Sequence, residues 1–132
     1  MNALVVDDSR TMRAILARAL QELGISVVGA ASAEEALVML QADDAPDLIM
    51  ADWHMPGTSG LDFVRALRRD ERFDATKVMM VSAEGIPALI GEAMRAGANE
   101  YLVKPFDAVA IAEKLALMNL PLASSDGLTD KD

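Results

Sequence analysis

The sequence predicts an α/β fold, a (βα)5 three-layer sandwich built around a parallel five-stranded sheet. Five short apolar segments alternate along the chain with five longer segments that have helical periodicity. The short segments are apolar on both faces, as strands of a parallel sheet are when helices cover both sides. Because parallel neighbours need a crossover connection, we expect a helix after each strand. A chain of 132 residues is long enough for one domain.

The strands are expected where short apolar runs, β-branched in part, stand between breaker-rich segments. These runs are 3–6, 25–30, 48–51, 78–81 and 101–103. Amphipathic patterns place the helices at 9–23, 33–42, 59–70, 87–97 and 107–119. The expected domain spans residues 1–119, and the polar, acidic segment 120–132 is expected to be a disordered tail.

Helix-start signals support these boundaries. Ser32, with Glu35 three positions later, has the pattern of a capping box. Ser59 and Asp107 are further N-cap candidates, because their side chains can accept from the free amides of the first turn. Pro87 suits a first helical turn, where its missing N–H leaves no hydrogen bond unmade.

Helix-stop signals agree with the same boundaries. Gly24 and Gly97 each follow a helical pattern at the position where a left-handed residue ends a helix.

The charge balance argues against a nucleic-acid-binding surface. The chain has 12 Lys and Arg residues against 21 Asp and Glu residues, a formal net charge of −9. Affinity for nucleic acid depends on clustered cations that neutralise phosphates, so no nucleic-acid partner is expected. The densest basic cluster, RALRRDER, is expected to form a solvated helix face.

The sequence shows no membrane or secretion signal. No apolar run reaches the roughly 18 residues that would cross a bilayer. The first residues lack the basic and apolar regions of a signal peptide. With no cysteine, the chain can form neither disulfides nor a thiolate metal site. We therefore expect a cytoplasmic protein without membrane insertion.

Chemically active side chains follow four of the five predicted strands. The carboxyl ends of parallel strands lie at one edge of the sheet, where ligands bind near the topological switch point. This edge should gather three carboxylates, a hydroxyl and an ammonium group: Asp7, Asp8, Asp52, Ser82 and Lys104. Asp7 or Asp8 alone could instead cap the following helix, but a cap would not explain the pair together with Asp52.

Three neighbouring carboxylates repel one another and need a cation. Mg²⁺ suits such a site, because it takes oxygen ligands and typically keeps waters and phosphate oxygens as well. Lys104 and Ser82 could then hold an anion. A carboxylate, a metal, an ammonium group and a hydroxyl are the parts that phosphoryl transfer requires. Carboxylates can also act as nucleophiles and form acyl phosphates.

Four sequence blocks at these strand ends resemble the response-regulator receiver domains, and most closely single-domain chemotaxis regulators of the CheY kind. The blocks are LVVDDSRTMR, ADWHMPGTSG, MMVSAEG and YLVKPF. The resemblance covers about residues 2–119 and implies the flavodoxin-like strand order 2-1-3-4-5. It also implies a signalling switch, which catalyses only its own phosphoryl transfer and dephosphorylation, and not an enzyme acting on other substrates.

The resemblance implies a role for each residue of the acidic cluster, which consists of Asp7, Asp8 and Asp52. Asp52 would be the phospho-acceptor, taking a phosphoryl group from a histidine kinase, its phosphotransfer domain or a small acyl phosphate. Asp8, Asp52 and the backbone carbonyl of His54 would bind Mg²⁺ directly, while Asp7 would act mainly through a water. The phosphoaspartate would form part of a two-component phosphorelay.

The same resemblance implies how the phosphoryl group is sensed. Ser82 would hydrogen-bond it and Lys104 would pair with it, and the Lys104–Pro105 bond would be cis. Tyr101 would be the switch aromatic, exposed in the inactive state and packed inward after Ser82 moves. An ordinary strand aromatic is the alternative for Tyr101.

A partner-binding face is implied along the fourth helix, fifth strand and fifth helix. It would include Ile90, Tyr101, Val103 and Lys114. A downstream protein, such as a flagellar motor switch component, would bind there. Gly85 and Pro87 depart from the usual pattern of chemotaxis regulators at the start of the fourth helix, so the identity of the partner is open. Motor control, phosphate buffering and a relay step remain alternatives.

Two residues flank the acceptor site at positions that vary among receivers. His54 stands two residues after Asp52, and Glu84 stands two residues after Ser82. Our hypothesis is that both side chains set the lifetime of the phosphate by controlling the access of water. An exposed loop histidine without a role is the alternative for His54.

Two other functions are compatible with parts of this pattern. A phosphatase of the haloacid-dehalogenase kind also uses an aspartate and Mg²⁺, but it would need a second acid where His54 stands. A receiver-like interaction module that takes no phosphate would not need the complete set of strand-end residues. Stable acylation of Asp52, rapid turnover or no reaction would distinguish the three.

Overall fold

The structure, a computed structural model, describes residues 1–120; the predicted tail lies outside them except for its first residue. Five parallel strands form one sheet in the order β2-β1-β3-β4-β5. The predicted fold class and strand order are therefore confirmed. The strands are β1 (Asn2–Val6), β2 (Ser26–Ala30), β3 (Leu48–Asp52), β4 (Lys77–Ser82) and β5 (Glu100–Val103).

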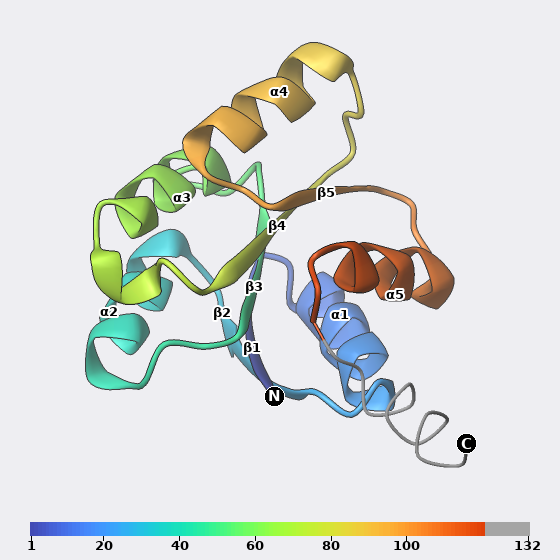
Figure 1. The fold of residues 1–132 in the computed structure, drawn as a ribbon, viewed down its shortest axis with the longest axis horizontal. Helices are drawn as coiled ribbons and strands as arrows, with labels where there is room; N and C mark the ends of the chain where they lie inside the picture. Colours follow the sequence, from blue (N-terminus) through green and yellow to red (C-terminus); the bar gives the residue numbers. More distant parts are fainter. Residues whose placement is uncertain (121–132) are drawn as a thin grey trace.

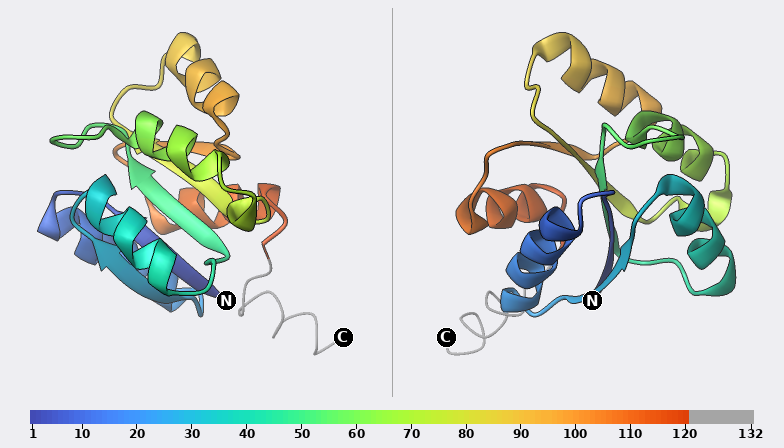
Figure 2. Two further views of the ribbon diagram at one scale, coloured as in Figure 1. Left: turned by 90° about the vertical axis from the view of Figure 1, so that its left-hand side faces the viewer. Right: turned by 180° about the vertical axis from the view of Figure 1, so that it is seen from behind.

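Helices cover both faces of the sheet (Figure 1). α1 and α5 lie on one face, and α2, α3 and α4 lie on the other, as the two further views also show (Figure 2). No helix among residues 1–120 is long and apolar enough to span a bilayer. The helices are α1 (Arg10–Glu22), α2 (Ala33–Ala42), α3 (Gly60–Arg68), α4 (Pro87–Ala96) and α5 (Ala108–Leu117).

One short 3₁₀ helix, η1 (Glu71–Phe73), follows α3 and was not predicted. The predicted helix at 59–70 therefore ends early, and the chain turns again before β4. A single turn is too short for a hydrophobic period to reveal it. Asp70 caps it by accepting a hydrogen bond from the amide of Arg72 at 3.0 Å.

The core has two hydrophobic layers, one on each side of the sheet. Because successive strand residues point to opposite faces, each central strand supplies both layers. This burial on both faces explains why the strands lack polar alternation. Ala3, Val5, Leu48, Met50, Met79 and Val81 belong to the layer beneath α1 and α5, and Leu4, Val6, Ile49, Ala51, Val78 and Met80 to the other layer.

The predicted N-caps are present, with one difference. Ser59 and Asp107 each accept a hydrogen bond from an amide of the first turn that follows them. The hydroxyl of Ser32 accepts from the amide of Glu35 at 3.0 Å. The carboxylate of Glu35 accepts from the amide of Ala31 at 3.2 Å instead of from Ser32, so the capping box is shifted by one residue on its return side.

The charged residues of the basic cluster at the end of α3 are exposed, as predicted, with one exception. Arg68 is half-buried and folds back against the neighbouring loops. Its guanidinium donates to the carbonyls of Phe73 (2.6 Å), Thr76 (2.8 Å) and Gly97 (3.0 Å) and to Asn99 Oδ1 (2.9 Å). Backbone carbonyls brought together by tertiary folding leave no trace in the sequence, so the pattern alone suggested a surface role.

We expect Arg68→Ala to lower the free energy of unfolding by about 2–4 kcal/mol, because several acceptors lose their donor together. Urea denaturation measures the change. The exposed neighbour Arg69 provides a matched control, and Arg69→Ala should stay within about 0.5 kcal/mol of the parent. Equal effects of the two substitutions would contradict a structural role for Arg68.

Candidate functional site

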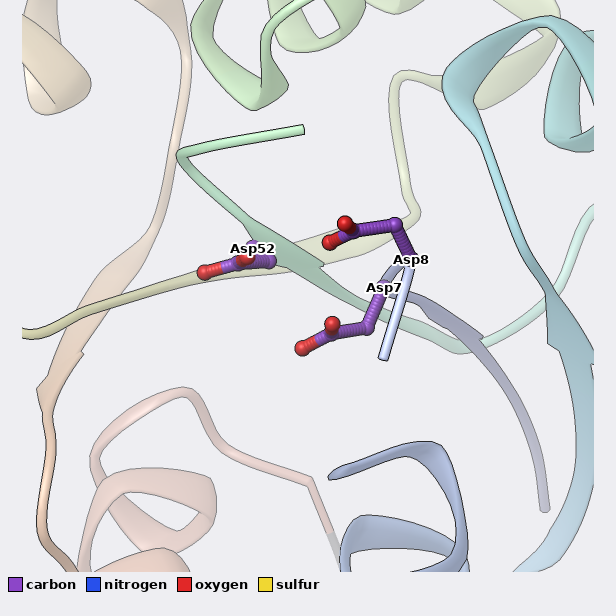
Figure 3. A group of neighbouring side chains, drawn as sticks. All are labelled: Asp7, Asp8 and Asp52. Atoms are coloured by element: carbon purple, nitrogen blue, oxygen red, sulfur yellow. The ribbon is translucent and has the colours of Figure 1, made fainter. Parts of the chain in front are cut away.

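Three carboxylates meet at the carboxyl edge of the sheet. Asp7 and Asp8 follow the last residue of β1, and Asp52 is the last residue of the neighbouring strand β3. Each side chain offers an oxygen, and these oxygens all lie within 4.8 Å of one another. All three side chains extend in the same direction from the strand ends (Figure 3). The sheet therefore brings together the cluster that the strand-end positions predicted.

Asp7 is the most constrained member of this cluster. Only 1% of its surface is exposed. Its Oδ1 accepts from the amide of Ser9 at 2.8 Å, whereas the buried Oδ2 has no hydrogen-bond partner among the described residues. Burial, and to a lesser degree the charges of Asp52 and Asp8, raise the pKa of Asp7.

Neither aspartate of the pair caps α1. That position is taken by Ser9, whose hydroxyl accepts from the amide of Met12 at 3.1 Å. The alternative that Asp7 or Asp8 serves only to cap the following helix is therefore wrong. Both carboxylates remain at the strand edge beside Asp52.

Lys104 supplies one positive charge to this edge. Its Nζ donates to Asp52 Oδ1 at 3.2 Å and lies 4.0 Å from Asp7 Oδ2. It follows the last residue of β5, and the Lys104–Pro105 peptide bond is cis, as predicted. One ammonium group beside three carboxylates leaves the site negatively charged, so the site favours a bound cation.

Ser82 is the last residue of β4, one position beyond the residue that pairs with Asp52. Its side chain is buried, and its hydroxyl oxygen accepts from the amide of Glu84 at 3.1 Å. The four predicted strand ends thus contribute to one edge. In the strand order, Asp52 on β3 stands between β1, which Asp7 and Asp8 follow, and the strands β4 and β5, whose ends carry Ser82 and Lys104.

The model of the response regulator receiver domain family matches residues 3–116 of this chain. This match covers well over half of the sequence. The chain belongs to the receiver domain family.

Several known proteins similar to this receiver domain are chemotaxis regulators. It is 40% identical over 119 residues to chemotaxis protein CheY1 of Helicobacter pylori, an alignment covering 89% of this chain and 96% of the relative. It is 43% identical over 116 residues to chemotaxis protein CheY of Pseudomonas aeruginosa, covering 87% and 93%. The solved structure of chemotaxis response regulator CheY4 of Vibrio cholerae has a TM-score of 0.83 at 33% identity, covering 89% of this chain and 97% of that one.

These matches establish homology to CheY chemotaxis response regulators, as the four sequence blocks suggested. The roles of individual residues in this chain remain predictions. The geometry around the acidic cluster shows which of them can act together.

Tyr101 of the receiver domain points inward. Only 3% of its surface is exposed, and its hydroxyl donates to the backbone carbonyl of Glu84 at 2.5 Å. Its ring meets Trp53 edge to face, with centroids 6.2 Å apart. The structure thus has Tyr101 in the inward position that the sequence analysis assigned to the active state; switching itself stays a prediction.

The two residues expected to control water access are in contact. His54 Nε2 and Glu84 Oε1 are 2.7 Å apart, and both side chains are more than half exposed. The contact joins the loop after β3 to the loop after β4, next to the acceptor site. Both residues were predicted to stand beside the acceptor site, but no local sequence pattern indicates a contact between side chains 30 positions apart.

The predicted partner face is only partly exposed. Val103 is 40% exposed and Ile90 is half-buried. Lys114 Nζ lies 3.2 Å from Glu100 Oε1. Tyr101 is buried, so in this inward conformation its side chain adds little exposed surface to the face. Its part in partner binding stays a prediction.

An apolar pocket of about 410 Å³ lies beside the acceptor site and was not predicted. Met12 and Ile15, three positions apart on α1, form one wall. Ile15 is 48% exposed. Single exposed aliphatic residues are common, so no sequence pattern indicated the pocket, and only the fold places Ile15 next to the other lining residues, Ala83, Lys104, Pro105 and Phe106.

Proposed function

We propose that this receiver domain is a phospho-accepting response regulator of a two-component phosphorelay, with Asp52 as the acceptor. The observation that carries the proposal is the buried Asp7 oxygen, which has no hydrogen-bond partner within residues 1–120 and lies beside Asp52 and Asp8. A buried charged oxygen is costly unless a partner compensates it. A divalent cation bound during phosphoryl transfer would provide that compensation.

The donor set fits Mg²⁺, a hard cation that takes oxygen ligands. Asp8, Asp52 and the backbone carbonyl of His54 would hold the ion directly, and Asp7 would hold it mainly through a water. When bound, the ion would neutralise the carboxylates and the charge of the phosphoryl oxygens. With no cysteine in the chain and a single histidine, a typical zinc site is not an alternative.

The chain's own residues account for the acylation step. A carboxylate oxygen of Asp52 attacks the phosphorus of a phosphohistidine, and the phosphorus–nitrogen bond breaks. The electron pair of that bond returns to the imidazole, which takes up a proton, and an acyl phosphate remains on Asp52. Lys104, now 3.2 Å from Asp52 Oδ1, would pair with a phosphoryl oxygen. Ser82 would donate its hydroxyl hydrogen to another.

The proposed output is a shift between conformations. A phosphoryl group binds better to the state in which Ser82 and Tyr101 are turned inward, and this state presents a changed α4–β5–α5 face. By analogy with its CheY relatives, we assign the chain to chemotaxis or motility. A histidine kinase or phosphotransfer domain would be the donor, and a protein such as a flagellar motor switch component would be the cytoplasmic target. The protein would not act as an enzyme on other substrates.

The apolar pocket beside Lys104 supports a protein phosphodonor. Met12, Ile15 and Phe106 offer apolar contacts within reach of the acceptor edge. A donor domain that presents its phosphohistidine from an apolar helix face could bury them. A small acyl phosphate would not need this surface.

Fluorescence of Trp53, which adjoins Asp52 in the chain, tests the proposal. We expect Mg²⁺ to change the emission, and beryllofluoride, a phosphoryl mimic, to change it again. In Asp52→Asn the second change should be absent. If the natural chain responds to neither ligand and its intact mass is unchanged by acetyl phosphate, it is a phosphate-independent interaction module instead.

The contact between His54 and Glu84 leads to a prediction about phosphate lifetime. We expect His54→Asn and Glu84→Ala each to accelerate dephosphorylation several-fold, because either change opens a path for water to the phosphoaspartate. The decay of phosphorylated protein after removal of the donor measures the rate. Unchanged decay in both variants would contradict the hypothesis and leave His54 as an ordinary loop residue.

A further inference from the structure

The loop between β3 and α3, residues 53–59, carries the His54 carbonyl that the proposed metal site requires. Its two ends are held together, because the amide of Gly60 donates to the carbonyl of Trp53 at 2.9 Å. Met55 is buried in the layer beneath α2, α3 and α4. The part of the loop after Met55 lies on the surface and needs a separate contact to hold its position.

Glu34 of α2 provides that contact. Its Oε2 accepts from the hydroxyl of Thr58 at 2.6 Å and from the amide of Thr58 at 3.2 Å. These hydrogen bonds hold the pKa of Glu34 below its usual range. The same carboxylate oxygen lies 3.2 Å from where a Cβ of Gly57 would stand, and Gly57 has φ of +80°. A larger residue at position 57 would therefore disturb both the turn and the contact.

The position of Glu34 relates this contact to the acidic cluster. Glu34 lies in the first turn of α2, shortly after the last residue of β2, Ala30. The carbonyl of Ala30 accepts from the amide of Asp7 at 3.1 Å. One short connection thus contacts Asp7 at one end and the loop that follows Asp52 at the other. The same segment therefore contacts residues on both sides of the proposed metal site.

We propose that Glu34 is a positioning residue for the proposed magnesium site, where it holds the loop 53–59 so that the His54 carbonyl stays beside the three carboxylates. This inference rests on the proposed function of the site. Mg²⁺ demands near-ideal ligand geometry, so a ligand on an untethered loop binds it less well. Groups that orient metal ligands typically contribute a factor of about 10–100 to metal affinity.

The two hydrogen bonds from Thr58 to Glu34 form the tether of the loop 53–59. Substitutions at these two residues distinguish an effect of the tether from an effect of the negative charge of Glu34. Thr58→Val removes the hydroxyl bond and changes no charge, whereas Glu34→Gln removes the charge and keeps an acceptor oxygen. Thr58→Ser keeps the hydroxyl and serves as the rescue variant. Glu22→Ala removes an exposed carboxylate at the far end of α1 and is the matched charge control.

Calorimetric titration of the full chain with Mg²⁺ tests the inference. We expect Thr58→Val and Glu34→Ala to lower the Mg²⁺ affinity about tenfold, and Thr58→Ser, Glu34→Gln and Glu22→Ala to stay near the parent value. Acylation by acetyl phosphate at saturating Mg²⁺ should reach the parent rate in Thr58→Val. Urea denaturation in Mg²⁺-free buffer should show all variants folded.

Two results would overturn the inference. Parent-like affinity in Thr58→Val would show that the tether does not position the ligand. Equal losses in Glu34→Gln and Glu34→Ala would assign the effect to charge. If the folded parent chain itself binds no Mg²⁺, the proposed metal site fails as well, which distinguishes that failure from failure of the tether alone.

Discussion

The Asp52→Asn variant, incubated with acetyl phosphate and Mg²⁺, should keep its mass while the parent chain gains a phosphoryl group. An amide oxygen is a poor nucleophile and cannot form the acyl phosphate. Loss of a covalent nucleophile typically lowers such a rate by at least about a thousandfold. Intact-mass spectrometry at low temperature measures the modified fraction directly.

Asp44→Asn is a suitable control, because Asp44 is an exposed carboxylate away from the acidic cluster. This variant should be modified at the parent rate. Modification of Asp52→Asn at a comparable rate would place the acceptor elsewhere and would contradict the proposed function. Peptide mapping of the modified parent would then identify the residue concerned.

The Asp7→Asn variant should be more stable than the parent in Mg²⁺-free buffer at neutral pH, by about 1–2 kcal/mol. The parent buries a charged oxygen that finds no hydrogen-bond partner in the described part of the chain, and such a group typically costs about 1–3 kcal/mol. An amide at this position carries no charge and can donate to the neighbouring carboxylates. Urea denaturation with and without Mg²⁺ measures the difference.

The pH dependence of this gain has a definite sign. Burial raises the pKa of Asp7 above the ordinary value of 3.8. The folded state therefore binds the Asp7 proton more tightly than the unfolded state, and the parent loses stability as pH rises from 3.8 through the folded pKa. The advantage of Asp7→Asn should appear over this window, persist at neutral pH and vanish below it.

Mg²⁺ should reverse the order of the two proteins. An ion present at about 100 times its dissociation constant stabilises the parent by about 2.7 kcal/mol, while the variant has lost the carboxylate that would hold the ion through a water and gains less. Asp8→Asn is the control, because Asp8 is exposed and its removal relieves little burial. A variant less stable than the parent without Mg²⁺ would contradict the inference that the buried Asp7 charge destabilises the parent, even with Lys104 Nζ 4.0 Å from Asp7 Oδ2.

The positions of the helices and strands were predictable because their signals are local. The N-cap of Ser32 and the positive φ of Gly24 depend on residues a few positions away. Burial of each strand on both faces produces continuous apolar runs that need no tertiary information to recognise. Asp52 and Ser82 turned out to be the last residues of their strands and not the residues after them, an ordinary uncertainty of one position.

The acidic cluster was also predictable, for a topological reason. Parallel strands connected by helices have all their carboxyl ends at one edge, so residues such as Asp7 and Asp52 must be neighbours once β1 and β3 pair. The residue types at those strand ends were enough to predict phosphoryl-transfer chemistry. The four receiver blocks then made the assignment specific.

Tertiary structure alone decided which side chains away from the strand ends touch. His54 contacts Glu84, Glu34 contacts Thr58, and Arg68 turns to four acceptors instead of facing water. Most of these contacts join segments far apart in the chain, and their geometry depends on rotamers and loop paths that packing selects. Local patterns therefore determined the fold and the edge where the chemistry lies, whereas packing determined how the loops around that edge are held.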